Sequence, residues 1–125
     1  MTQFFLAIAS ALGGLSVVFG AFASHALKDR LSDRALEIWE TGTRYQMYHS
    51  LALLIVVLLL SRTAPLPTAL LVSGWAFIVG IVLFSGSLYA LALSGVKVLG
   101  AITPFGGVAF IFGWIALLVA AWEFK

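Results

Sequence analysis

Apolar segments long enough to cross a lipid bilayer occupy most of this chain. The first runs from Phe4 to Ala23 without a charged residue, and about 20 such residues span the hydrocarbon core of a bilayer. Only 10% of all residues are charged and 62% are hydrophobic, whereas about a quarter are charged in soluble domains. Water could not solvate so apolar a chain, so the sequence predicts an all-α, integral membrane protein.

Four such segments divide the chain, and we expect each to form one helix of a four-helix bundle. The chain is then one transmembrane domain, 1–125, with spans at about 3–26, 42–61, 67–93 and 99–122. Pro65 and Pro67 separate the second and third spans, which must be antiparallel neighbours because proline cannot continue a helix. The first span could instead be a secretory signal, but no Lys or Arg precedes Phe4, and its length favours a retained helix.

Two interpretations exist for the start of the fourth helix. Thr103–Pro104 is typical of an N-cap followed by proline at the first helical position. Alternatively, the helix begins near Val98 and kinks at Pro104. We favour the first interpretation, in which 96–103 is irregular backbone that protein must cover or that lines a cavity.

The polar segment 28–44 differs from the rest of the chain because it carries most of the charges. We expect an interfacial amphipathic helix over about 32–43, which either leads into the second span or is continuous with it. Ser32 is the expected N-cap, and Asp33 in the first turn suits the positive end of the helix dipole. The charges are interpreted as a solvated face.

Basic residues also predict the orientation of the bundle. The connections after the first and third helices hold five Lys and Arg, and the opposite side holds two. Because cytoplasmic loops are enriched in these residues, we expect both termini outside and these two connections in the cytoplasm. The five are Lys28, Arg30, Arg34, Arg44 and Lys97, and the two are Arg62 and Lys125.

The topology also gathers polar residues at one end of the bundle. Polar side chains within membrane spans are costly unless paired, so these should face one another. His49 lies deepest, about 10 Å inside the expected boundary, and we expect it to contact the third helix near Ser85 or Tyr89, with His25 nearby. The candidate ligand-binding residues are His25, Tyr45, Gln46, Tyr48, His49, Ser85, Ser87, Tyr89 and Thr103.

Several functions compete for this polar end. The leading interpretation is a hydrogen-bonded lock that fixes the order of the helices, in a non-enzymatic protein that is structural or accessory to a membrane complex. The alternative is a pocket for a lipid or small molecule, and the third is a small oligomeric transporter or a proton relay through His25 and His49. Without cysteine, two histidines are weak evidence for a metal site.

We therefore assign no catalytic residue, no metal ligand and no cofactor. Membrane lipids are the expected partners, together with either further copies of the chain or a larger membrane complex. Nucleic acid is excluded as a partner because the basic residues lie in connections and at helix ends rather than on one basic face.

Four segments resemble one known family. They are Gly20–Leu27 (GAFASHAL), Tyr45–Leu53 (YQMYHSLAL), Phe84–Tyr89 (FSGSLY) and Ile102–Gly107 (ITPFGG). In this order they are similar to the YgdD/YwdK-like family of small bacterial inner-membrane proteins, a domain of unknown function that is itself similar to a small mitochondrial-associated transmembrane protein of animals. The resemblance covers nearly the whole chain. It implies a four-helix, multi-pass protein of the bacterial cytoplasmic (inner) membrane and supplies no activity.

Overall fold

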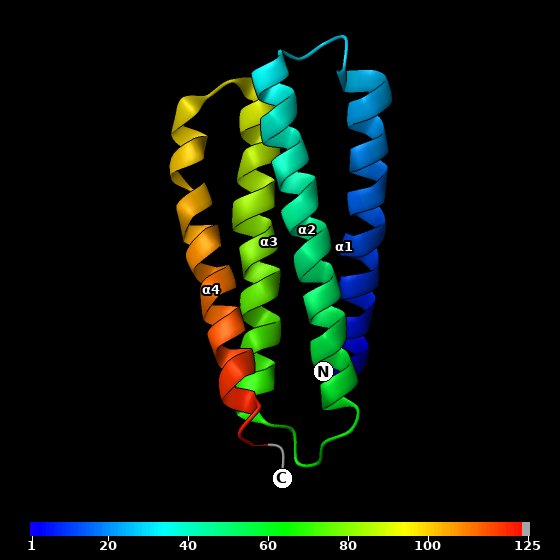
Figure 1. Ribbon diagram of the computed structural model, residues 1–125, viewed down its shortest axis with the longest axis vertical. Helices are drawn as coiled ribbons and strands as arrows, with labels where there is room; N and C mark the ends of the chain where they lie inside the picture. The colour runs from blue at the N-terminus through cyan, green and yellow to red at the C-terminus, as the bar shows by residue number, and fades with distance from the viewer. Residues whose placement is uncertain (124–125) are drawn as a thin grey trace.

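Four long antiparallel helices make up the computed structural model, which describes residues 1–123 (Figure 1). A π-helical turn, Ala23–Leu27, continues the first helix, and a 3-10 helix, Lys97–Ala101, precedes the last. The all-α bundle predicted from the sequence is confirmed, since each long helix is apolar enough and long enough to cross a membrane. The helices are α1 (Thr2–Phe22), α2 (Asp33–Leu60), α3 (Thr68–Ser94) and α4 (Thr103–Ala120).

The amphipathic segment and the second span form one continuous helix, α2, which is the second of the two alternatives considered above. Ser32 caps it as predicted, because its hydroxyl accepts a hydrogen bond from the Ala35 amide at 3.1 Å. No proline lies between Asp33 and Leu60, so nothing breaks the helix where the charged part meets the apolar part. The helix ends just before the turn that contains Pro65 and Pro67.

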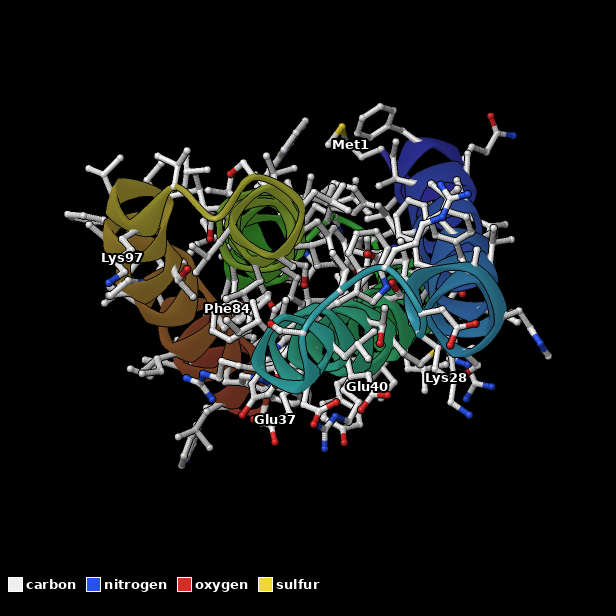
Figure 2. The ribbon with its side chains drawn as sticks, turned by 90° about the horizontal axis from the view of Figure 1, so that it is seen from above. Met1, Lys28, Glu37, Glu40, Phe84 and Lys97 are labelled. Atoms are coloured by element: carbon white, nitrogen blue, oxygen red, sulfur yellow. The ribbon has the colours of Figure 1, made fainter. Side chains whose placement is uncertain are left out.

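The two central helices are α2 and α3, and the outer two flank them. Along the bundle the order is α4, α3, α2 and α1 (Figure 1), and from above α1 and α4 lie on opposite flanks (Figure 2). The apolar core lies mainly between α2 and α3, with Leu53 and Phe77 fully buried. Phe5 reaches this core from α1, and Phe110 reaches it from α4. The outer faces of α1 and α4 are exposed and apolar, as a membrane requires.

Glycine permits a close approach of α4 to the backbone of α3. A Cβ at Gly106 of α4 would lie 2.3 Å from the Phe84 amide nitrogen of α3. Small residues at such crossings are common in membrane proteins, because helices there gain their attraction from close packing rather than from leaving water. This crossing fixes the distance between α3 and α4.

The start of α4 corrects two details of the prediction. The connection expected to be irregular over 96–103 contains the 3-10 helix Lys97–Ala101. Helix α4 begins at Thr103, and Pro104 lies in its first turn, but the capping position is Ile102 and no side chain caps the helix. The Thr103 hydroxyl lies instead 2.6 Å from the Ser87 hydroxyl of α3. A partner on the neighbouring helix has therefore replaced the local capping bond.

Candidate functional site

Gln46 is the centre of the polar residues inside the bundle. Its side chain is buried, with 2% of its surface exposed. The side-chain amide donates to the Leu12 carbonyl of α1 at 2.7 Å, and its oxygen accepts from the Tyr89 hydroxyl of α3 at 2.6 Å. A buried amide is stable only when it is hydrogen-bonded, and this one is bonded to both neighbours of α2. One side chain thus joins three helices.

Hydroxyl groups add further bonds around Gln46. Ser85 of α3 donates to the Gly42 carbonyl at 2.7 Å, and Ser16 of α1 donates to the Thr43 carbonyl at 2.8 Å. The backbone of α2 is therefore held on two sides within one turn. We use the name polar cluster for the residues whose side-chain hydrogen bonds join the helices here: Ser16, Trp39, Gln46, His49, Ser85, Ser87, Tyr89, Thr103 and Trp114.

An aromatic wall closes the polar cluster towards the end of the bundle. The Trp39 indole donates to the Phe19 carbonyl of α1 at 2.9 Å. Its ring centre lies 4.6 Å from that of Tyr89, and Phe19 meets the Tyr89 ring edge-on at 5.2 Å. Gly42 makes room for this ring, since a Cβ there would lie 2.8 Å from a Tyr89 ring carbon. Tyr89 is thus fixed by both its ring and its hydroxyl.

His49 lies deeper, between α2, α3 and α4, with 5% of its surface exposed. The Trp114 indole donates to His49 Nε2 at 3.1 Å, and His49 Nδ1 lies 2.8 Å from the Tyr45 carbonyl. Because an indole N–H can only donate, Nε2 must accept, and Nδ1 must carry the hydrogen that it donates to the carbonyl. The ring also stacks on Phe110, with ring centres 3.5 Å apart and an interplanar angle of 8°. The structure therefore fits a neutral imidazole with both nitrogens occupied.

The deep position of His49 corrects the expected geometry. On α3 its ring neighbour is Phe77, at 5.6 Å, rather than Ser85 or Tyr89. Phe77 lies eight residues before Ser85, or about 12 Å along the helix. The antiparallel pairing of α2 and α3 explains the offset. Gly42 lies level with Ser85, and His49 is seven residues further along α2, so His49 meets α3 about two turns before Ser85.

Three of the predicted residues lie outside the polar cluster. His25 is exposed on the π-helical turn, and Tyr48 has 54% of its surface exposed. Tyr45 is 40% exposed, although its ring packs on that of Phe84, with ring centres 4.7 Å apart. Phe84 itself lies between α2 and α4 (Figure 2). Topology placed these residues at the correct end of the bundle, but the rotation of each helix turns them outward.

Two aromatic residues of α4 were missed by the sequence reasoning. Phe110 and Trp114 provide the stacking partner and the hydrogen-bond donor of His49. Their spacing of four residues puts them on one face of a helix, and that spacing was the available signal. In an apolar span, however, residues that face lipid show the same spacing of four.

The polar cluster is closed. Within residues 1–123, every buried side-chain nitrogen or oxygen has a hydrogen-bond partner, and no three His, Cys, Asp or Glu residues lie close enough together to hold a metal. The groove between α3 and α4, of about 660 Å³, is lined by apolar residues such as Trp75, Phe105 and Phe112 instead. A ligand at the polar cluster would have to displace hydrogen bonds that the protein already makes.

Known proteins share the part of the chain that contains most of the polar cluster. The family model described as "Protein of unknown function (DUF423)" matches residues 19–107. The chain belongs to this DUF423 family. A UPF0382 membrane protein of Staphylococcus epidermidis is 50% identical over 110 residues, covering 88% of both chains. The UPF0382 membrane protein YwdK of Bacillus subtilis is 47% identical over 107 residues, covering 86% of both chains, which confirms the resemblance found from the sequence segments. No solved structure matches.

Proposed function

We propose that this DUF423 protein is a non-enzymatic, multi-pass membrane protein with a structural or accessory role in a larger membrane assembly. The closed polar cluster is the observation that supports the proposal. Interhelical hydrogen bonds in membrane proteins contribute only about 0.6 kcal/mol each on average. The polar cluster therefore determines which helix faces meet more than it raises stability, as suits a scaffold of fixed shape.

The reactive groups of the polar cluster are already engaged, which weighs against catalysis there. General acid–base chemistry needs a group within hydrogen-bond reach of a substrate. The free electron pair of His49 accepts from Trp114, and the Tyr89 hydroxyl donates to Gln46. Both groups would have to exchange an internal partner for a substrate.

A transporter or proton relay is the weaker proposal for the same reason. A relay needs polar groups that continue across the membrane. Beyond His49 and Ser50, in the half of the bundle nearer the α2–α3 turn, Ser73 is the buried polar side chain that the structure describes. Its hydroxyl donates to the Gly113 carbonyl at 2.9 Å. One serine bonded to a backbone carbonyl leaves a gap in any such path.

Exposed apolar faces on the outer helices leave room for a neighbouring subunit. Val17 and Val18 of α1 have 62% and 58% of their surfaces exposed, and Ile111 of α4 has 62%. These faces meet lipid in a monomer and protein in an assembly. A bacterial cytoplasmic membrane remains our proposal, supported by the similarity to membrane proteins of Staphylococcus epidermidis and Bacillus subtilis. The five Lys and Arg in the α1–α2 and α3–α4 connections support placing these connections inside.

Native mass spectrometry of patches taken from the membrane without detergent tests the role. One chain has a mass of 13.4 kDa, so an accessory subunit should give a particle that contains at least one further protein chain. Single 13.4 kDa chains with lipid only would refute the proposed role.

Because the chain lacks cysteine, labelling of Lys28→Cys from the outside of intact cells would refute the proposed orientation.

A further inference from the structure

A second polar region lies away from the polar cluster, where α2 begins and α3 ends. Two adjoining cavities there have volumes of about 440 and 420 Å³, and Arg34 and Ile38 line both of them. Lys97, which follows α3, borders the first cavity, and Arg44 of α2 borders the second. We call this pair of cavities the basic groove. It brings together cations from two separate segments of the chain.

The charge of the basic groove is positive. Glu37 is the acid among its lining residues, and its carboxylate lies 3.2 Å from the Arg34 guanidinium. Both side chains are largely exposed, at 79% and 68%, and such exposed ion pairs are weak because water screens them. Arg44 reaches only the Glu40 carbonyl of its own helix, at 3.5 Å. Three cations against one acid leave a surplus of positive charge that an anion would neutralise.

The floor of the basic groove is apolar. Ile38 of α2 and Leu88 and Leu91 of α3 line the cavities between the charged residues. A small inorganic anion would gain nothing from such a floor. A phospholipid would use both parts, because its phosphate meets the cations and its chains cover the apolar residues.

The level of the basic groove along the helices also fits a lipid headgroup. Arg34 is the second residue of α2, and Lys97 follows the end of α3 by three residues, so both lie at the ends of membrane-spanning helices. Arg44 lies ten residues further along α2, or about 15 Å, and its long side chain can extend towards the polar boundary. The three cations therefore surround the depth at which lipid phosphates lie.

We propose that the basic groove binds the headgroup of an anionic phospholipid, with the phosphate between Arg34, Arg44 and Lys97 and the acyl chains over Leu88 and Leu91. This proposal does not depend on the accessory role, since it concerns a surface outside the polar cluster. In the proposed orientation the basic groove opens to the cytoplasmic leaflet.

Lipid titration by native mass spectrometry of the full chain tests the proposal, with phosphatidylglycerol and phosphatidylcholine as probes. The groove variant is Arg34→Gln with Lys97→Gln. The matched control is Lys28→Gln with Arg30→Gln, which removes the same charge from the same end of the bundle, and Lys28 lies on the opposite flank from Lys97 (Figure 2). We expect phosphatidylglycerol to bind the groove variant about ten- to thirtyfold more weakly than the wild type, and the control within about twofold of it.

Three results would overturn the proposal. Equal losses in the groove variant and the control would show diffuse surface attraction. Equal binding of phosphatidylglycerol and phosphatidylcholine would show no recognition of charge, and full displacement by inorganic phosphate would show a free-anion site. All replaced side chains are exposed, so the variants should keep the wild-type melting temperature. If the double variant does not, Arg44→Gln alone is measured, with an expected loss of about fivefold.

Discussion

Gly106→Ala is the substitution with the clearest steric consequence in this bundle. The added Cβ would lie 2.3 Å from the Phe84 amide nitrogen and 2.7 Å from its Cα, whereas ordinary contacts begin at 3.4 Å. Backbone atoms of α3 cannot rotate away, so α3 and α4 must separate locally by about 1 Å. Overpacking of this kind costs about 1–3 kcal/mol. Alanine also stabilises a helix relative to glycine by up to about 1 kcal/mol. A control variant must therefore contain the same change from glycine to alanine without the clash.

Gly107→Ala is that control, because the nearest atom to its Cβ would be 4.0 Å away on Phe84. It gains the same helix propensity without the clash. The assay is the free energy of unfolding in mixed micelles, measured by helicity during titration with dodecyl sulfate. We expect Gly106→Ala to be less stable than Gly107→Ala by about 2 kcal/mol. Equal stabilities would refute the close approach of α3 to α4.

Two further substitutions test the polar cluster in the same assay. Ser85→Ala removes the bond to the Gly42 carbonyl and should lower the free energy of unfolding by about 0.6 kcal/mol, up to about 1.7. The control is Ser24→Ala, which should leave stability unchanged because Ser24 is exposed and bonded within its own helix. An equal effect at both sites would contradict the interhelical role of Ser85. Gly42→Ala should displace the Tyr89 ring and be less stable than Gly86→Ala by about 1–3 kcal/mol, because a Cβ at Gly86 meets no atom within 4 Å and gains the same helix propensity. Equal stabilities of these two variants would show that Tyr89 is not held in place.

The architecture could be predicted because the membrane leaves few alternatives. A bilayer requires backbone hydrogen bonds to be satisfied within each span, so apolar segments of this length must be helices. Pro65 and Pro67 then set the α2–α3 turn, and Ser32 sets the start of α2. Whether the charged first turns of α2 formed a separate helix could not be decided, because a helix with a solvated end and a helix that lies along the interface share the same pattern of charges.

The polar cluster could be predicted only in part, because topology fixes depth and leaves rotation open. Gln46 and Tyr89 lie at the same end of adjacent helices and meet, as depth alone suggested. His25 lies at that end too and faces outward. The partner of His49 is a tryptophan on α4, and nothing in the sequence orients Trp114 inward rather than towards lipid. Such contacts depend on close packing between helices, which the glycine positions allow but do not specify.

The protonation of His49 in a bilayer is the most direct test of the closed polar cluster. Solid-state NMR of the ¹⁵N-histidine-labelled protein at neutral pH distinguishes the two nitrogens, and the exposed His25 provides the internal comparison. We expect a neutral His49 ring with its proton on Nδ1 and with an unprotonated Nε2 whose signal shifts in Trp114→Phe. A proton on Nε2, a doubly protonated ring, or an Nε2 signal that ignores Trp114→Phe would contradict a cluster closed on itself.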